Sequence, residues 1–520
     1  MKTTPKTSNL FHSKLTAGAF AALAPALISL TFSSTAHAAT LTWDGGNPTN
    51  PAWYANTNWD GSAPADGDSL VFAGNLVTTH FAYAGSDGDG DLQVAGITFA
   101  DDAGAFVIND AGGGIIKLQG DITNDDADLQ TLNFNFQLNG GNRTVDTSAG
   151  DIAIGGIISQ DVAGLSLTKA GSHTLTLSGA NTHTSTQIGA TNGVTAGTVS
   201  IRNNAALGTG NLDYGAGGTL QLGVDGLAVA NGIFVGNRID TAARTIQLDL
   251  AGSNTGELTG NIDIRVDQVG EFVADVGTDD TLTFSGNLVT GAGGNAGLIK
   301  AGAGTLVLEG TNTYKGPTTV SSGTLIVDGN SSGVAGAMTI DVSGTLAGSG
   351  TIGASLLTVN GVIAPGNSPG TLTTGAQLWN DGGAYLWEIN DMAGTKGDDS
   401  GWDWLSIGGT LTINPTFDIL ITSLTNPGNV SGLADGFDYT GLSYLDSYAS
   451  FTIATATSIS GFDASDFNLN DSSFLNPKVG WSIENIGNDI VLNAFFVPEP
   501  SSTALLGLGG LALMLRRKRS

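Results

Sequence analysis

An internal repeat is the feature that most constrains what this chain can fold into. The segment LTKAGSHTLTLSGANTHT from Leu167 aligns without gaps with LIKAGAGTLVLEGTNTYK from Leu298. Each copy leads into a second apolar segment, GTVSI from Gly197 or GTLIV from Gly323. One strand-turn-strand unit cannot bury its apolar face alone, so such copies must stack. The repeat therefore predicts a solenoid. The positions shared by the two copies are Lys169 and Lys300, Gly171 and Gly302, Leu175 and Leu306, Leu177 and Leu308, Gly179 and Gly310, and Asn181 and Asn312.

The solenoid is predicted to be all-β. Between Leu41 and Ile413, short alternating apolar segments end at Gly, Asn or Asp, and no stretch has the spacing of an amphipathic helix. We predict a right-handed parallel β-helix over residues 39–413, with repeat copies at 167–201 and 298–328, rather than an array of β-sandwiches. At roughly 20 to 25 residues per coil it would hold about 15 to 18 coils. Expected strands include Gly96–Phe99, Thr131–Leu138, Thr245–Leu250 and Thr281–Phe284.

The corners of the coils should fall at the shared glycines and asparagines. Glycine adopts positive φ without steric cost, which suits Gly171 and Gly302. Asn181 and Asn312 would either form a hydrogen-bonded ladder between coils or adopt the same left-handed conformation.

Residues 414–496 are predicted to form a separate small antiparallel β module. FDILI from Phe417, SFTIAT from Ser450, and WSIEN and DIVLNAFF from Trp481 and Asp489 alternate well, with residues 486–488 turning the last hairpin. A solenoid needs such a cap, because its last coil otherwise exposes strand edges and core to water. The indole rings just upstream are expected to pack at the junction, with a sugar-stacking platform as the alternative. These are Trp387, Trp402 and Trp404.

The N-terminal residues 1–38 are predicted to be a secretory signal peptide. Three lysines precede the small and apolar stretch 17–30, and Ala36, His37 and Ala38 form a small-x-small cleavage pattern. Signal peptidase would cleave after Ala38.

The C-terminal residues 497–520 are predicted to be a second targeting segment. Pro498, Glu499 and Pro500 precede a thirteen-residue apolar run, 503–515, which should form a short hydrophobic helix. Because a helix needs about twenty apolar residues to span a bilayer, we expect transient membrane contact rather than permanent anchoring. An ordinary transmembrane anchor is the alternative. The basic cluster that stops the run would stay on the cytoplasmic side: Arg516, Arg517, Lys518 and Arg519.

This three-part order resembles the PEP-CTERM sorting signal of exopolysaccharide-producing bacteria. The resemblance implies cleavage near Pro498, Glu499 and Pro500 by a membrane transpeptidase called exosortase, which passes the protein to the cell surface.

A second resemblance covers about half of the chain. The copy over 300–328, with SGTLAGSGTIG from Ser343 and GVIAPGNSPGTLT from Gly361, is similar to the autotransporter-associated β-strand repeat. Trp43-Asp44-Gly45, Trp59-Asp60-Gly61 and the Gly67-Asp68…Phe72 pattern are also typical of the start of such proteins. The resemblance implies a passenger-like β-helix. We expect no translocator barrel, because about eighty residues between 413 and the sorting signal are too few for its strands.

Charge and composition exclude several functions. Without the two targeting ends, which hold seven of the 18 basic residues and one of the 47 acidic residues, the charge is near −35. A nucleic-acid backbone would be repelled. The chain has no cysteine, which excludes disulfides, thiol nucleophiles and cysteine-ligated metals.

Sequence motifs for catalysis or metal binding are weak. His80, His173 and His183 are not shared between the repeat copies, and neither a serine-histidine-aspartate pattern nor an HExxH motif is present. Asp87, Asp89 and Asp91 imitate the start of a calcium loop, but Leu92 and Thr98 stand where its glycine and glutamate belong. A solvated acidic turn is favoured, and no cofactor is expected apart from that calcium alternative.

Two functions follow from these observations. The favoured one is an exported, non-catalytic surface or extracellular-matrix protein with a structural or adhesive role, whose partners beyond signal peptidase and exosortase are an exopolysaccharide or a neighbouring cell surface. The alternative is a polysaccharide hydrolase or lyase on the same scaffold. A carboxylate-lined groove with a nearby base would favour the enzyme, and a smooth threonine and asparagine surface the structural protein. The candidate catalytic acids of the enzyme alternative are Glu388, Asp398, Asp399 and Asp403.

Overall fold

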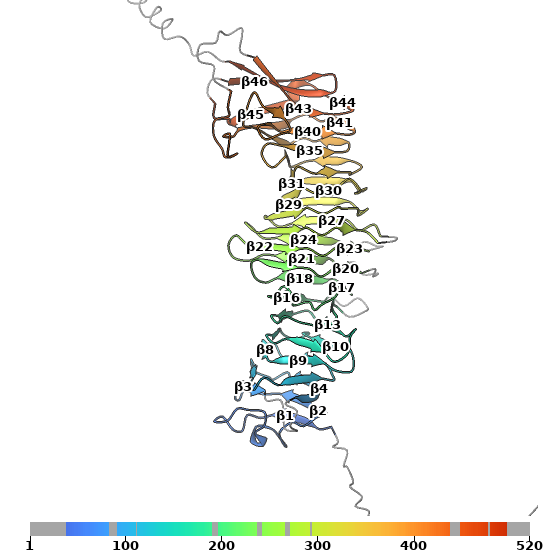
Figure 1. The fold of residues 1–520 in the computed structure, drawn as a ribbon, viewed down its shortest axis with the longest axis vertical. Coiled ribbons are helices and arrows are strands. Elements are labelled where there is room, and N and C mark those ends of the chain that lie inside the picture. The colour runs from blue at the N-terminus through green and yellow to red at the C-terminus, as the bar shows by residue number, and fades with distance from the viewer. Residues whose placement is uncertain are drawn as a thin grey trace, which may run out of the picture. The chain divides into compact units, whose positions relative to one another are not determined.

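The chain folds as a parallel β-helix. The computed structural model describes residues 38–82, 91–110, 112–189, 196–236, 242–265, 271–291, 294–436, 448–476 and 479–496. Within them short strands alternate with turns, and the helical elements are the single 3-10 turns η1 (Asn56–Asn58) and η2 (Ala464–Asp466). Most strands pair with their counterparts in the coils before and after them, so equivalent strands of successive coils stack in chain order (Figure 1). The predicted fold class is confirmed.

One face carries an unbroken parallel ladder, which has sixteen strands among the described residues. This agrees with the predicted coil number. In ladder order they are β3 (Thr79–Ala82), β5 (Val107–Asp110), β8 (Gln130–Asn133), β11 (Ile152–Ile154), β14 (Thr174–Leu177), β16 (Thr198–Ile201), β18 (Gly218–Leu222), β21 (Arg244–Leu248), β24 (Phe272–Val276), β27 (Leu298–Ala301), β29 (Thr318–Val327), β31 (Met338–Gly348), β33 (Leu357–Val359), β36 (Gln377–Trp379), β41 (Thr410–Ile413) and β44 (Ser458–Ser460).

A second ladder joins the same sheet through β29 and β31, which are long enough to serve both. Its other strands are β19 (Leu227–Val229), β22 (Thr255–Leu258), β25 (Thr281–Phe284), β28 (Thr305–Leu308), β34 (Val362–Pro365), β37 (Ala384–Ile389), β42 (Phe417–Ser423) and β45 (Phe467–Ser473). Two short strands, β38 (Thr395–Lys396) and β39 (Gly401–Trp402), attach to β37.

A further parallel sheet covers the other side of the earlier coils. It consists of β1 (Thr40–Trp43), β2 (Asp68–Phe72), β4 (Leu92–Phe99), β7 (Ile122–Asn124), β10 (Arg143–Asp146), β13 (Ser166–Ala170), β15 (Ser185–Ile188), β17 (Leu212–Tyr214), β20 (Ile233–Val235), β23 (Ile262–Ile264) and β26 (Leu288–Val289), with a branch of β6 (Ile115–Leu118), β9 (Asn135–Leu138) and β12 (Ile158–Gln160).

The third sheet covers the later coils and contains the antiparallel element predicted near the C-terminus. β43 pairs in parallel with β40 but antiparallel with β47, and β46 pairs antiparallel with β47 across a turn at Gly487. The parallel ladders continue through β42, β44 and β45, so they cross residue 413, where the separate module was predicted to begin. The sheet comprises β30 (Asn330–Ser331), β32 (Thr351–Ile352), β35 (Thr371–Thr374), β40 (Trp404–Ile407), β43 (Tyr448–Thr455), β47 (Asp489–Phe496) and β46 (Val479–Ile486).

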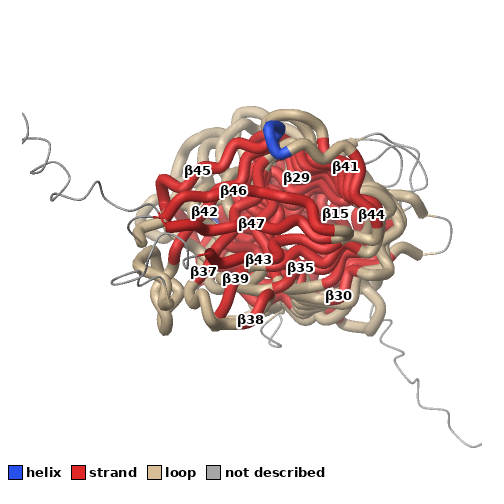
Figure 2. Tube along the Cα trace, turned by 90° about the horizontal axis from the view of Figure 1, so that it is seen from above, coloured by secondary structure: helices blue, strands red, loops and turns tan. Residues whose placement is uncertain are grey.

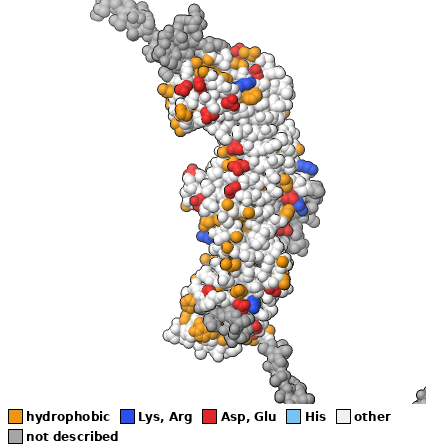
Figure 3. Space-filling view, viewed as in Figure 1, with side chains coloured by type: hydrophobic (Ala, Val, Ile, Leu, Met, Phe, Trp, Pro, Cys, Tyr) orange, Lys and Arg blue, Asp and Glu red, His pale blue; other side chains and the backbone are white. Residues whose placement is uncertain are grey.

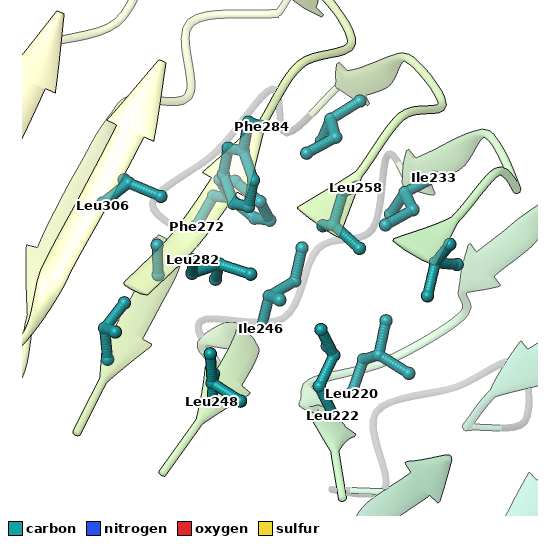
Figure 4. Close-up of a cluster of buried hydrophobic side chains, with 14 of the residues drawn as sticks. Leu220, Leu222, Ile233, Ile246, Leu248, Leu258, Phe272, Leu282, Phe284 and Leu306 are labelled. Atoms are coloured by element: carbon teal, nitrogen blue, oxygen red, sulfur yellow. The ribbon is translucent and has the colours of Figure 1, made fainter. Parts of the chain in front are cut away.

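The strand alternation separates a shared apolar interior from a polar exterior. Viewed along the stack, strands of successive coils overlie one another (Figure 2). On the face drawn in Figure 3, uncharged atoms cover most of the surface, and acidic side chains are more frequent than basic ones. Figure 4 shows inward side chains such as Leu220, Ile246 and Leu282 pointing into a common core, where all three are fully buried. Burial of such a side chain contributes about 1.5–3 kcal/mol, so the stack supplies the stability that disulfides cannot.

One predicted strand was wrong in a way that reveals a corner. Thr131–Leu138 was expected to be continuous, but it forms β8 and β9, which belong to different sheets. The chain turns at the buried Phe134 between them. Apolar alternation continues around a corner because both faces enclose the same interior.

The repeat asparagines bridge neighbouring coils. Asn181 Oδ1 accepts from the Ile158 amide at 2.7 Å, and its Nδ2 donates to the Ala206 carbonyl at 2.7 Å. Asn312 Oδ1 likewise accepts from the Leu288 amide at 2.9 Å. Neither asparagine has positive φ, so the left-handed alternative is wrong. Both asparagines bridge coils, but their partners are backbone groups of the neighbouring coils and, for Asn312, the Ser331 hydroxyl, rather than another asparagine.

Candidate functional site

The structure brings together two of the four acids proposed for an enzyme. Glu388 lies on β37, and Asp403 ends the insertion 390–403, which lengthens one coil before β40. Asp398 and Asp399 are exposed on that insertion. Asp399 instead binds two amide side chains, those of Asn390 at 2.6 Å and Asn429 at 2.9 Å. The four acids therefore do not form one group.

Asp403 is a fully buried carboxylate whose two oxygens are both occupied by backbone donors. Oδ1 accepts from the Gly370 amide at 2.8 Å and Oδ2 from the Glu388 amide at 2.9 Å. Burial, together with the nearby Glu388 charge, raises the pKa of Asp403 well above its usual range. Such a carboxylate ties the turn before β35 to β37. Asp403 therefore joins two backbone segments and is not exposed to solvent.

Glu388 contacts the hydroxyl group of Ser368. Among the described residues of this cluster, it is the one hydroxyl that resembles a nucleophile. Ser368 donates from Oγ to Glu388 Oε2, and burial raises the pKa of Glu388. Ser368 has positive φ, as nucleophiles in tight turns do. However, the next residue is Pro369, which has no amide proton, and the Gly370 amide is bonded to Asp403. The backbone donors that would stabilise an oxyanion next to Ser368 are thus missing or occupied.

The three tryptophans pack at the junction, as predicted. Trp387 is fully buried and donates to the Asp403 carbonyl at 3.1 Å. Trp402 donates to the Thr452 carbonyl, and Trp404 to Thr455 Oγ1, both at 3.1 Å on β43. Lys396 covers the Trp404 ring at 4.2 Å. The indoles therefore join the insertion to the last coils, and they do not form an open stacking platform.

Both repeat copies place a lysine in the core, which the sequence analysis missed. Lys169 stacks between Val145 and Ile188 in its ladder, and Lys300 between Ala274 and Val320. Both side chains are buried. The Lys169 ammonium donates to carbonyls at its own corner at 2.6 and 3.0 Å. The Lys300 ammonium donates to carbonyls at its own corner at 2.8 and 2.9 Å and to the Ser322 carbonyl of the next coil at 3.2 Å. Desolvation lowers the pKa of each lysine to about 8, although neighbouring aspartates act in the opposite direction.

The lowered pKa values of the two lysines predict that the stability of the fold rises with pH above pH 8. Between pH 8 and 10.5 the unfolded chain binds a proton at each lysine that the folded chain does not, so raising the pH favours folding. We expect each lysine to add about 2 kcal/mol to the free energy of unfolding between pH 7 and 10. Guanidinium unfolding across this range should show the rise, and Lys300→Met should remove part of it. Lys315→Met, at an exposed corner, controls for loss of charge. An equal slope in Lys300→Met would contradict this role.

The histidines have structural environments. His80 is buried in the first coils, where it stacks on Trp43 with ring centroids 4.2 Å apart and accepts from Trp53 Nε1 at 3.0 Å. Burial lowers the pKa of His80 to about 3 and that of buried His183 to about 4. His173 is exposed. Trp43 and Trp59 pack edge to face, so the tryptophan motifs of the sequence close the interior at this end.

The exterior carries columns of threonine. Outward positions in register form one column on β14, β16, β18 and β21, and another on β25, β28, β29 and β31. The first column is Thr174, Thr198, Thr219 and Thr245, and the second is Thr281, Thr305, Thr324 and Thr345. Amide ladders add to this surface where Asn360, Asn380 and Asn414 are linked at 2.7 and 2.8 Å. This is the threonine and asparagine surface that favours the structural reading.

Most predicted targeting residues lie outside the described part of the chain: Ala36, Pro498, Glu499, Pro500, Arg516, Arg517, Lys518 and Arg519. Ala38 is exposed at the start of the described region. The apolar run 503–515 is also outside it, and no helix within the described ranges is long and apolar enough to cross a membrane. Signal-peptide cleavage stays a prediction.

The calcium loop is described only in part. Asp87 and Asp89 fall in the undescribed stretch 83–90. Asp91 forms an ion pair with Lys117 at 2.9 Å, and its Oδ1 accepts from the Ile115 amide at 3.2 Å. Calcium binding there stays a prediction.

Two protein families match segments of this chain. The family described as "Passenger-associated-transport-repeat" matches residues 167–201 and 298–327, which are the two repeat copies. The family described as "PEP-CTERM protein-sorting motif" matches residues 496–519. Both resemblances drawn from the sequence are confirmed. The motif and the repeats mark an exported protein of the cell surface.

Curated relatives share only part of the chain. An extracellular serine protease of Serratia marcescens is 46% identical over 99 residues, covering 19% of this chain and 9% of the protease. The adhesin BmaC autotransporter of Brucella suis biovar 1 (strain 1330) is 29% identical over 328 residues, covering 58% of this chain and 8% of the adhesin. The chain thus spans less than a tenth of the length of either relative.

Proposed function

We propose that this chain is a non-catalytic structural or adhesive protein of the cell surface or extracellular matrix, released through its sorting signal. Signal peptidase would remove residues 1–38, and an exosortase-type transpeptidase would cleave near Pro498, Glu499 and Pro500. The sorting motif at 496–519 supports this route. The similarity to an adhesin over more than half of the chain supports the adhesive role.

The exterior of the coils is the observation that carries the proposal. A column of outward threonine on β25, β28, β29 and β31 and a ladder of asparagine repeat from coil to coil. Such a surface offers many equivalent weak contacts, which suits attachment to an extended partner. The buried acids favour the same conclusion, because Asp403 has both oxygens bonded to backbone amides and Glu388 binds Ser368.

Incubation of the secreted protein with neutral and acidic polysaccharides tests the absence of catalysis. We expect no release of reducing ends or unsaturated products above that of a heat-denatured sample, while immunolabelling of intact cells detects the protein outside. Glu388→Gln and Asp403→Asn serve as paired variants. Polysaccharide cleavage that either variant abolishes would overturn the proposal in favour of a hydrolase or lyase. Protein retained inside the cell would contradict the surface role.

A further inference from the structure

An uncharged stripe lies on the outside of the coils around the second repeat copy. We define it by eight outward positions on β25, β28, β29 and β31, in two neighbouring columns that are each in register from strand to strand. All eight are partly exposed, and their inward neighbours are buried. The first column is Thr281, Thr305, Thr324 and Thr345, and the second is Thr283, Val307, Ile326 and Ala347.

The hydroxyl groups of this stripe make no hydrogen bonds within the part of the chain that the structure describes. None of its five threonines makes a side-chain hydrogen bond to another described residue, whereas Thr255, one strand earlier, donates to Asp225. Each hydroxyl can therefore donate one and accept two hydrogen bonds from a partner. The apolar column beside them presents Val307, Ile326 and Ala347 at the same spacing of about 4.8 Å between strands.

The absence of charge on the stripe selects the kind of partner. Acidic residues exceed basic residues by 29 over the whole chain, so an anionic polymer would be repelled from most of the surface. A cationic partner would be drawn to the carboxylates elsewhere rather than to these eight positions. The stripe favours a neutral partner with hydroxyl groups along one edge and an apolar surface beside them.

We infer that the uncharged stripe binds a linear neutral polysaccharide lying along the stack. Sugar rings combine equatorial hydroxyls with apolar C–H faces, which match the two columns. Equivalent positions on successive strands match a partner that repeats along its length. This inference rests on the proposed adhesive function and identifies the binding face and the chemical class of its partner.

A valine series tests the stripe without disturbing the strands. Valine keeps the branched shape and the strand preference of threonine but lacks the hydroxyl. The test variant is Thr281→Val, Thr305→Val, Thr324→Val and Thr345→Val together. The matched control is Thr174→Val, Thr198→Val, Thr219→Val and Thr245→Val, because that column is also in register but has Thr176, Ser200, Gln221 and Gln247 beside it instead of apolar residues.

Native gel electrophoresis of the secreted protein, with soluble mixed-linkage β-glucan, glucomannan or dextran in the gel, measures binding. We expect at least one neutral polymer to retard the protein, polygalacturonate to leave it unchanged, and the test variant to bind about tenfold more weakly. The control variant should bind like the original protein. Ile326→Ser, which alters only the apolar column, should also weaken binding.

Three results would overturn the inference. These are retardation by polygalacturonate alone, equal retardation of the test variant and the original protein, and absence of retardation by every neutral polymer. Sedimentation that showed the test variant losing self-association would assign the stripe to a second copy of the chain instead. Surface display and the lack of cleavage activity are measured separately, so the proposed function can stand while this inference fails.

Discussion

Alanine in place of Pro498, Glu499 and Pro500 is expected to leave the C-terminal segment attached. Proline fixes its own φ and disfavours a helical conformation for the residue before it, and Glu499 carries the only charge of the tripeptide. Alanine at the three positions frees the backbone and removes the charge. We expect cleavage to be lost in a host that carries an exosortase, and the protein to remain in the membrane fraction.

Mass measurement of the C-terminal peptide and cell fractionation check this result. Ser501→Ala with Ser502→Ala is the matched control, because these residues follow the tripeptide directly and contain neither proline nor charge. The control should be processed normally. Processing of the triple variant at the ordinary site would show that the tripeptide is not what the transpeptidase recognises.

Gly302→Ala is expected to destabilise the protein strongly. Gly302 has φ +75°, and a Cβ there would lie 2.1 Å from the Val276 carbonyl oxygen of the preceding coil. A left-handed alanine costs about 1–2 kcal/mol, and the contact adds to it because it meets backbone rather than a movable side chain. We expect a loss of about 3 kcal/mol or more.

Gly226→Ala separates these two costs. Gly226 has φ +73°, but nothing lies within 4 Å of the position that a Cβ would take there. Its substitution should therefore lose only the backbone contribution of about 1–2 kcal/mol. Guanidinium unfolding of both variants measures the difference. Equal losses would mean that the coils can separate to admit the methyl group, and that their close approach at Gly302 contributes little.

The sequence predicted the repeat-built part of the fold well because alternation records burial directly. Leu175 and Leu306 are inward as expected, and Gly171 and Gly302 have positive φ at the corners. The same alternation contained the inward lysines, since Lys169 follows Leu167 by two positions. The alternation therefore indicated that both lysines point inward, and their charge is the reason that this inward position was not predicted.

Other features could not be read from the sequence. Parallel and antiparallel strands share a two-residue period, so Phe417–Ser423 gave no sign that it continues the parallel stack. Asp403 reaches Gly370 only because an insertion folds back, and the four nearby acids looked equivalent before their partners were known. Contacts across an irregular segment leave no periodic trace.

The unbroken ladder also determines how the protein would yield to tension. Each coil is hydrogen-bonded to its two neighbours, and the sorting segment follows Phe496 in the last coils. A pull transmitted from the C-terminal side would peel coils in succession rather than break the stack at once. Coils of 20 to 26 residues, the spacings at Lys300–Val320 and Ala274–Lys300, would each release roughly 70–90 Å of chain. Stepwise lengthening of this kind would dissipate an applied force gradually.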